Sequence, residues 1–329
     1  MTFDERVNSI AAKGYTGCQA EFVAMVMLHS GVCTVRQYCE FTGRPRGQKS
    51  QDFFSELTAN KHASSFLGPN GRLRIFHIFA SALYDAIGEP DNRNRKPLSP
   101  GAAIEKLMLL DAVLASRDLQ WLATENEKLA HFTRQFGTQL RRSDLPHLTF
   151  GKAPDIATRY FPDKLPIGLS DGETVFTFLV RGGNPMDFRA FLQRHSELLR
   201  ALQNWRLRLL LPRHLVRFER LFLNVFAEEL LTPLRPGAVS ELEWFFELRR
   251  AGRTEGSAER SERFHNAALA FEGPRFAALY RRWLEAGPSA LAGLSSPVLV
   301  DAVARGRAKV EPYVLAHPYV HFQSMLGTA

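Results

Sequence analysis

The sequence predicts an α+β fold that is mainly helical, with an N-terminal winged helix-turn-helix followed by a mixed α/β domain. Three helical segments precede a turn-centred pair of alternating segments, which is the element order of a winged helix. After residue 142, a strand–strand–helix–strand order predicts a small mixed sheet, and the chain from residue 214 onward is mostly helical. The expected domains are a winged helix over 1–97, a helical connector over 98–141, and an α/β domain with a helical C-terminal region over 142–329.

The first three helices follow from apolar spacing and capping residues. Residues 1–29 are dense in apolar side chains and are expected to be helical. A second, short helix should begin at Thr34, a favoured N-cap residue, and end at Gly43. A third helix is expected at about residues 50–60. Its buried face should consist of Phe53, Phe54 and Leu57.

A β-hairpin is expected directly after the third helix. Apolar and polar residues alternate on both sides of "GPNG" at residues 68–71, and this tetrapeptide is a turn signal. In a winged helix the second helix braces the third, the third enters the major groove, and the hairpin forms the wing. The pattern therefore predicts a DNA-binding unit at the N-terminus.

The basic stretch "TGRPRGQKSQDFF", residues 42–54, lies where such a unit would meet DNA. Its cations surround the start of the third helix, where free N–H groups and the helix dipole already favour anions. Expected phosphate contacts are Arg44, Arg46, Lys49, Arg72 and Arg74. Expected base contacts, all with short or amide side chains, are Gln48, Ser50, Gln51 and Ser55. The alternative is a helical domain with a solvated basic turn.

Composition limits the class of protein. The 329 residues carry a formal charge of +8, which favours polyanionic partners, double-stranded DNA above all. No apolar run approaches a membrane span, and the first residues lack the apolar core of a signal peptide, so we expect a cytoplasmic protein. Three cysteines without a CxxC pair indicate reduced thiols, and zinc held by Cys33, Cys39 and His62 would match no common ligand spacing. We expect no cofactor, no resident metal and no membrane partner.

The later elements are placed by the same signals. A periodic helix is expected over 102–117, followed by a capping box formed by Thr124 and Glu127. The segments "RYFPDKLPIGL" and "TVFTFLVRGG" are expected to be two strands joined by the turn "SDGE". An amphipathic helix in "PMDFRAFLQRHSELLRALQNW" and a buried strand in "RLRLLLP" complete the small sheet.

Motifs for chemistry are sparse, and two alternatives to DNA binding remain. The sequence contains no P-loop, no dinucleotide-binding glycine pattern, no HExxH and no GxSxG. The stretch "FPDKL" opens like a PD-(D/E)xK nuclease core, in which acids on adjacent strands hold a divalent metal. A metal-dependent nuclease would have to use Asp163 and Glu173, because apolar residues occupy the other positions of the second strand. In the second alternative, the helical C-terminal half docks a protein partner.

The layout also resembles bacterial mobile-element proteins of the plasmid replication-relaxation type. The resemblance is carried by the winged helix, by "RIFHIFASALYDAIGEPDNRNRKP", and later by "DLQWLATENEKLAHF" and "YFPDKLPIGL". It implies a winged helix ahead of a nuclease-like, PD-containing sheet, here a degenerate one because the acidic pair that such sheets often carry after the PD strand is missing. The resemblance therefore implies a non-catalytic DNA-binding regulator, or a replication or mobilisation accessory, of a plasmid or integrated element. A homodimer is a further expectation, since winged helices often act as dimers.

Overall fold

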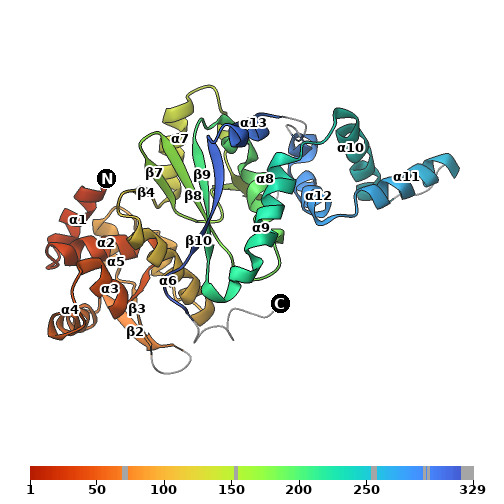
Figure 1. Ribbon diagram of the computed structural model, residues 1–329. Coiled ribbons are helices and arrows are strands. Elements are labelled where there is room, and N and C mark those ends of the chain that lie inside the picture. The colour runs from red at the N-terminus through yellow and green to blue at the C-terminus, as the bar shows by residue number, and fades with distance from the viewer. Residues whose placement is uncertain (69–72, 152–154, 253–257, 292–293, 295–296, 320–329) are drawn as a thin grey trace.

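The computed structural model is α+β and mostly helical, and it has three parts along the chain (Figure 1). A helical N-terminal part carries a small sheet, a central part is built on a five-stranded sheet, and a helical extension projects beyond it. The residues that the structure describes are 1–68, 73–151, 155–252, 258–291, 294 and 297–319.

The N-terminal part contains five helices and a three-stranded antiparallel sheet. The helices are α1 (Phe3–Ala11), α2 (Cys18–His29), α3 (Val35–Thr42), α4 (Gln48–Ala59) and α5 (Ser81–Ala86). The strands are β1 (Val32–Thr34), β2 (Ala63–Leu67) and β3 (Arg74–Ile78), in the spatial order β1-β3-β2. The single helix expected over 1–29 is wrong in one respect, because the chain breaks at Gly14 and Gly17, whose φ angles are +103° and +54°. Strand β1 was not expected.

The central sheet has the spatial order β10-β9-β8-β7-β4. Its strands are β4 (Gln120–Leu122), β7 (Ile167–Ser170), β8 (Glu173–Leu179), β9 (Trp205–Leu211) and β10 (Ala308–Val314). Strands β8, β9 and β10 are parallel, whereas β4 and β7 are antiparallel to their neighbours. Helix α8 (Met186–Ala201) makes the crossover between the parallel strands β8 and β9, so the expected strand–strand–helix–strand order is confirmed.

Two sequence expectations about this sheet are wrong. The first strand, expected to be continuous over 159–169, is two strands, β6 (Ala157–Tyr160) and β7, separated by a loop. The connector expected over 98–141 is not purely helical, since β4 belongs to the sheet. The region from residue 214 onward is mostly helical, as expected, but β10, which returns to pair with β9, was not expected. Pro312 lies within β10, which is tolerated because β10 is an edge strand.

Further helices cover the sheet and form the extension. The connector contains α6 (Pro100–Ala115) and α7 (Glu125–Phe136), and the Thr124–Glu127 capping box at the start of α7 is confirmed. The remaining α-helices are α9 (Glu219–Phe226), α10 (Pro236–Ala251), α11 (Ala258–Ala270), α12 (Pro274–Ala286) and α13 (Val298–Ala304). Short 3-10 or π segments are η1 (Arg93–Arg95), η2 (Arg142–Asp144), η3 (Arg213–Phe218), the π-helical η4 (Ala227–Leu231) and η5 (Gly287–Leu291).

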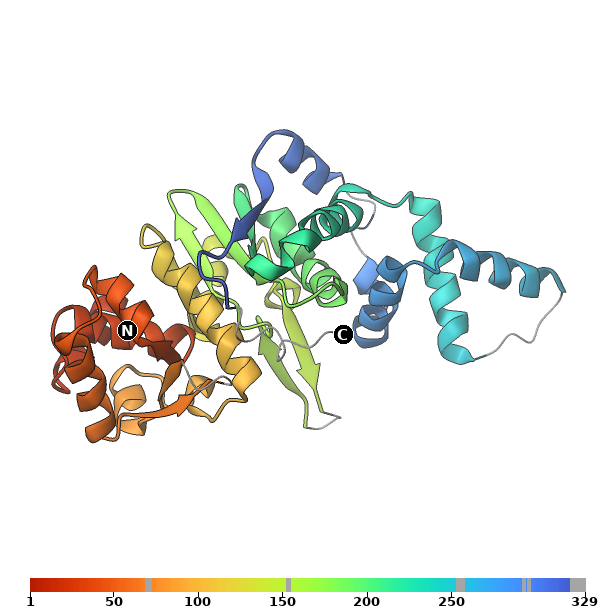
Figure 2. The same cartoon turned by 60° about the horizontal axis from the view of Figure 1, so that its bottom comes forward.

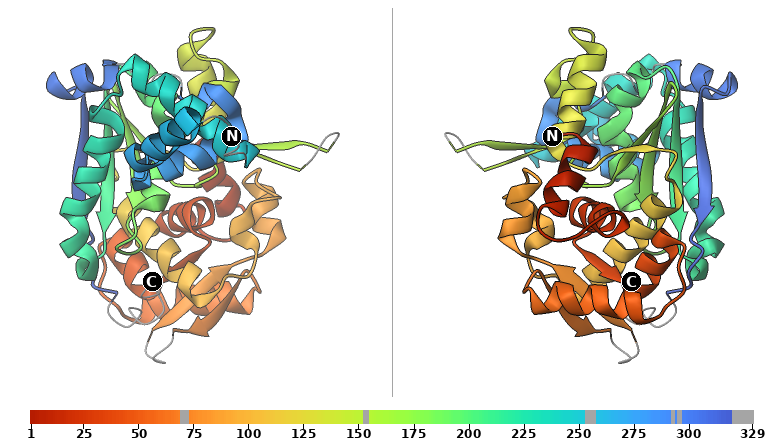
Figure 3. Two further views of the ribbon diagram at one scale, coloured as in Figure 1. Left: turned by 90° about the vertical axis from the view of Figure 1, so that its right-hand side faces the viewer. Right: turned by 90° about the vertical axis from the view of Figure 1, so that its left-hand side faces the viewer.

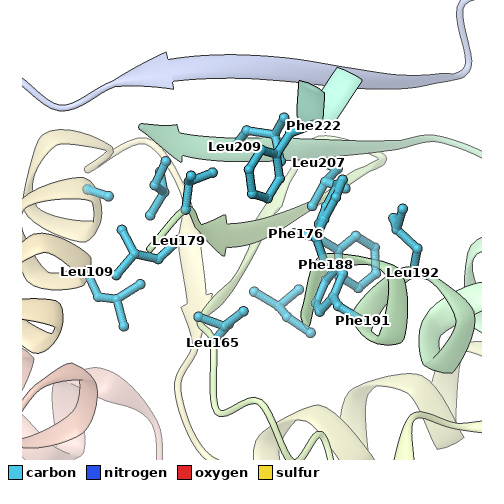
Figure 4. Close-up of a cluster of buried hydrophobic side chains, with 14 of the residues drawn as sticks. Leu109, Leu165, Phe176, Leu179, Phe188, Phe191, Leu192, Leu207, Leu209 and Phe222 are labelled. Atoms are coloured by element: carbon cyan, nitrogen blue, oxygen red, sulfur yellow. The ribbon is translucent and has the colours of Figure 1, made fainter. Parts of the chain in front are cut away.

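Three separate hydrophobic clusters hold these parts. The N-terminal cluster packs α1 to α5 around residues such as Phe22 and Phe53. The central cluster fills the space between the sheet and α6, α8 and α9, with Phe176, Phe188 and Phe222 among its rings (Figure 4). A third cluster lies within α10, α11, α12 and η5. The extension thus has a core of its own, and the expectation that it docks a protein stays a prediction.

A two-stranded ribbon stands out from the body. Strands β5 (His147–Phe150) and β6 pair antiparallel and project away from the central sheet (Figures 2 and 3). Phe150 and Ile156, near the end of the ribbon, are exposed. The base of the ribbon leads directly into the loop 161–166, and through it into β7.

Candidate nucleic-acid interface

The turn before α4 is set by the end of α3. Gly43 adopts a left-handed conformation with φ +64°, and the backbone N–H of Arg44 closes the last turn on the carbonyl of Cys39 at 3.0 Å. The expected termination at Gly43 and the expected N-cap at Thr34 are both confirmed. Arg44 and Arg46 follow in an exposed segment. The chain therefore reverses sharply and presents two guanidinium groups directly before α4.

Aromatic packing fixes α4 by one face only. Phe53, Phe54 and Leu57 are almost fully buried, as expected. The ring of Phe53 stacks on Tyr38 of α3 at a centroid distance of 4.3 Å, and Phe54 contacts Phe76 of β3 at 4.2 Å. Helix α4 is thus braced by α3 on one side and by the small sheet on the other.

The opposite face of α4 is polar and open to solvent. Gln48, Lys49, Gln51 and Ser55 are exposed, and the Gln48 amide donates a hydrogen bond to Asp52 at 2.6 Å. The expectation that Ser50 also faces outward is wrong. Ser50 is only 4% exposed, and its hydroxyl donates to the carbonyl of Gly47 at 2.7 Å and accepts the Gly47 N–H. Ser50 therefore caps the helix and is unable to read a base.

Positive charge collects at the start of α4 without compensation. Arg44, Arg46 and Lys49 are exposed, and none forms an ion pair within the part of the chain that the structure describes. The first turn of α4 also contains no acidic residue. Three cations therefore add to the partial positive charge of a helix N-terminus, an arrangement that favours an external anion.

Strands β2 and β3 form the hairpin, which lies beside α4, where Phe54 packs on Phe76 of β3. Arg74 begins β3 and is exposed, paired across the hairpin with Leu67. Arg72, the second wing residue expected to contact phosphate, lies outside the described residues. Arg74 therefore adds an exposed cation to the hairpin that packs beside α4.

A buried hub ties the bracing helix α3 to the rest of the molecule. The Asp111 carboxylate of α6 accepts hydrogen bonds from Arg36 at 2.9 and 3.0 Å, from Gln37 at 2.6 Å and from the Tyr319 hydroxyl at 2.6 Å. Arg36 also donates to Tyr319 at 3.1 Å. Sequence reasoning missed this hub, because no local pattern links residues 36, 111 and 319. The contact holds α3, and through it α4, against α6 and the segment after β10.

The basic segment at residues 93–96 is also held in place by contacts with the N-terminal part. The Asn94 side chain is buried and donates to the carbonyl of Met27 at 2.9 Å, while His77 bonds the Asn94 carbonyl at 2.9 Å. The Arg95 guanidinium lies over the ring of Tyr84. Arg93 is exposed. This segment is therefore not a loose linker.

The residues of the nuclease alternative are not brought together. Asp163 precedes β7, and Glu173 begins β8 beyond the turn, so the antiparallel register places them at opposite ends of this hairpin. Each carboxylate is also neutralised by its own arginine, Asp163 by Arg194 at 2.8 Å and Glu173 by Arg206 at 2.6 Å. A shared metal between these two acids is inconsistent with this geometry.

The zinc candidates have other surroundings. Cys33 is buried in β1, Cys39 is partly exposed on α3, and His62 bonds the Tyr15 hydroxyl at 2.7 Å through Nδ1. Across the described ranges, no three His, Cys, Asp or Glu side chains converge as ligands for a metal ion.

Comparison of the chain with known protein families, with curated proteins and with solved structures found no match. Among the helices of the described residues, none is both long enough and apolar enough to cross a bilayer. The functional argument therefore rests on the geometry of the chain itself.

Proposed function

We propose that this protein binds double-stranded DNA through a winged helix-turn-helix, with α4 in the major groove and the β2–β3 hairpin as the wing. The observation that carries the proposal is the exposed start of α4, where Arg44, Arg46 and Lys49 have no carboxylate partner within the described residues. The order α2, β1, α3, α4, β2, β3 and the sheet order β1-β3-β2 support it.

The contacts divide into two groups by chemistry. Arg44, Arg46, Lys49 and Arg74 would hold phosphates, because their charges are exposed at the start of α4 and on the adjoining hairpin. Gln48, Gln51 and Ser55 would face base edges, since their side chains lie on the exposed face of α4. Ser50 takes no part in this set. The resemblance to relaxation-type proteins extends the proposal to a non-catalytic regulator or replication accessory of a mobile element.

Duplex binding at several salt concentrations tests the phosphate contacts. With about four phosphates neutralised, log K should fall against log salt with a slope of about −3.6. Arg44→Gln/Arg46→Gln should flatten this slope by about 2 and weaken binding at least about tenfold, uniformly across sequences. Fluorescence anisotropy with a labelled duplex of random sequence gives both quantities.

The matched control removes the same charge elsewhere. Arg281 on α12 and Lys309 on β10 are exposed and form no ion pair in the described part of the chain. Arg281→Gln/Lys309→Gln should therefore leave both affinity and slope close to those of the wild type. A flat salt response, or an equal loss in the control variant, would contradict the proposal.

Base reading needs a different measurement. Gln51→Ala should change which sequences are selected from a random duplex pool, with about 1–3 kcal/mol lost at one base position, while the salt slope stays unchanged. Identical selected sequences for Gln51→Ala and the wild type would remove Gln51 from the base-reading set. The mass of the selected complex tests the expected homodimer.

A further inference from the structure

A second group of cations converges far from α4 in the sequence, where the segment at residues 93–96, α6, α7 and the loop 161–166 meet. Burial, and then the charges of Arg93 and Arg159, lower the pKa of Lys164. The charge of Lys164 adds to burial in lowering the pKa of Lys106. Lys128, Arg159 and Lys164 line a hollow of about 60 Å³ at the base of the β5–β6 ribbon. The five cations of this cluster are Arg93, Lys106, Lys128, Arg159 and Lys164.

The carboxylates around this five-cation cluster are largely engaged by other arginines. Asp163 is paired with Arg194 at 2.8 Å. Glu105 is paired with Arg181 at 3.2 Å, and Glu127 is paired with Arg6. Glu125 lines the hollow and accepts the backbone N–H of Tyr160 at 2.9 Å, so it contributes one negative charge. Among the residues that the structure describes, five positive charges therefore face one carboxylate, that of Glu125, without an arginine partner.

Burial increases the free-energy cost of this excess positive charge. Lys128 is 1% exposed, and its ammonium donates to the carbonyl of Leu165 at 2.7 Å rather than to a carboxylate. Lys106 forms no hydrogen bond or ion pair within the described residues. Desolvation lowers the pKa of both lysines to about 8. An anion in the hollow would relieve the repulsion and favour the charged form of each lysine.

The loop that supplies Lys164 has an uncommon backbone. Phe161 and Lys164 have φ angles of +47° and +54°, in the left-handed region that residues other than glycine rarely adopt. The Phe161 N–H donates to the carbonyl of Pro146 at 2.7 Å, and its ring stacks with Phe132 at 5.6 Å. Such conformations persist where the surroundings impose them, and they concentrate at binding sites.

We propose that the hollow binds a phosphate group, held by Arg159 and Lys164 beside the buried Lys128, with Lys106 and Arg93 adding positive charge nearby. A phosphate suits this cluster better than a carboxylate, because it carries up to two negative charges and several acceptor oxygens. The guanidinium of Arg159 offers the forked donors that match two of those oxygens. The hollow has room for a single tetrahedral anion, so the remainder of the ligand must extend outward beside the ribbon.

Titration calorimetry of the full chain with pyrophosphate at low ionic strength tests this site. Arg159→Gln/Lys164→Gln should weaken pyrophosphate binding at least about tenfold, because two of the charged donors are removed. Arg281→Gln/Lys309→Gln removes the same charge from α12 and β10 and should bind like the wild type. Far-UV circular dichroism and thermal unfolding show that each variant remains folded. Equal pyrophosphate affinity in all three proteins would overturn the proposal.

Duplex titrations with the same variants identify the source of the phosphate. A salt slope flattened by about 1.8 in Arg159→Gln/Lys164→Gln would assign the site to a nucleic-acid backbone. An unchanged slope together with lost pyrophosphate binding would assign it to a free phosphate or a phosphorylated small molecule. A wild type that binds pyrophosphate but no duplex would refute the proposed function and leave the phosphate site standing.

Discussion

Around α8, arginine side chains are buried against carboxylates. The arginines of the turn before α4 are exposed and have no carboxylate partner within the described residues. The Arg189 side chain is 5% exposed and donates to Glu228 and Glu229, each at 2.6 Å. Glu229 also accepts the Gln193 amide at 3.0 Å, and Arg275 lies 4.0 Å away. Arg44 and Arg46 have no such partner within the described residues.

The difference shows that one residue type can serve two purposes in one chain. A buried arginine whose carboxylate is removed leaves an uncompensated charge, so the pairs around α8 are tied to folding. An exposed arginine contributes little to stability by itself, and its charge is available to a partner. A positive net charge therefore indicates a binding site less well than a group of exposed cations that have no carboxylate partner.

Removing a carboxylate from the buried network around α8 should have the largest effect on stability. Glu229→Ala would leave Arg189 and Arg275 without their shared carboxylate, because the Glu229 side chain is 1% exposed and lies between them. We expect the free energy of unfolding to fall by about 3–5 kcal/mol. Urea denaturation followed by circular dichroism measures the change.

An exposed glutamate is the control for this substitution. Glu247 on α10 is exposed and forms no ion pair in the described part of the chain, so Glu247→Ala should change stability by less than about 0.5 kcal/mol. A small effect of Glu229→Ala would mean that this buried network does not support the fold, and the contrast with the turn before α4 would disappear.

Two lysines of the five-cation cluster, Lys106 and Lys128, predict an effect of intermediate size. It is a change of the free energy of unfolding with pH. Burial lowers the pKa of Lys106 and Lys128 to about 8, against 10.5 when unfolded. The unfolded state therefore binds more protons above pH 8, and stability should rise with pH. Burial raises the pKa of the Cys33 thiol above its ordinary 9.0, which opposes the rise beyond that pH. We expect a gain on the order of 1 kcal/mol between about pH 7.5 and 9.

Urea denaturation at a series of pH values measures this gain, and Lys128→Met separates its sources. The variant removes one of the two lysines, so the rise in the free energy of unfolding should shrink to about half. A profile that is flat or falls over this range would show that the two ammonium groups are better compensated than the structure indicates.

The sequence predicted local structure well where capping and periodicity act within a few residues. Thr34 and Gly43 bound α3 as expected, and the Phe53–Leu57 face of α4 packs inward. Ser50 was misassigned, because a serine near a helix start serves equally well as a cap or as an outward donor.

Contacts between segments far apart in the chain were not predicted from the sequence. Strand β10 and the Asp111 hub join segments far apart in the chain, and no local pattern pairs them. The arginine partners of Asp163 and Glu173 were hidden for the same reason, although the apolar second strand had already indicated a degenerate site. The exposed cations before α4 were predictable because their exposure depends on a local turn.

The cations at the start of α4 should contribute least to stability and most to duplex binding. In Arg44→Gln/Arg46→Gln/Lys49→Gln, three cations are removed from beside the N-terminus of α4, an end of the helix dipole that disfavours positive charge. The free energy of unfolding should therefore stay constant or rise by up to about 0.5–1 kcal/mol, while duplex affinity falls. Urea denaturation and anisotropy on one preparation give both values. A loss of stability would show that these cations serve the fold, and the proposed reason for their exposure would fail.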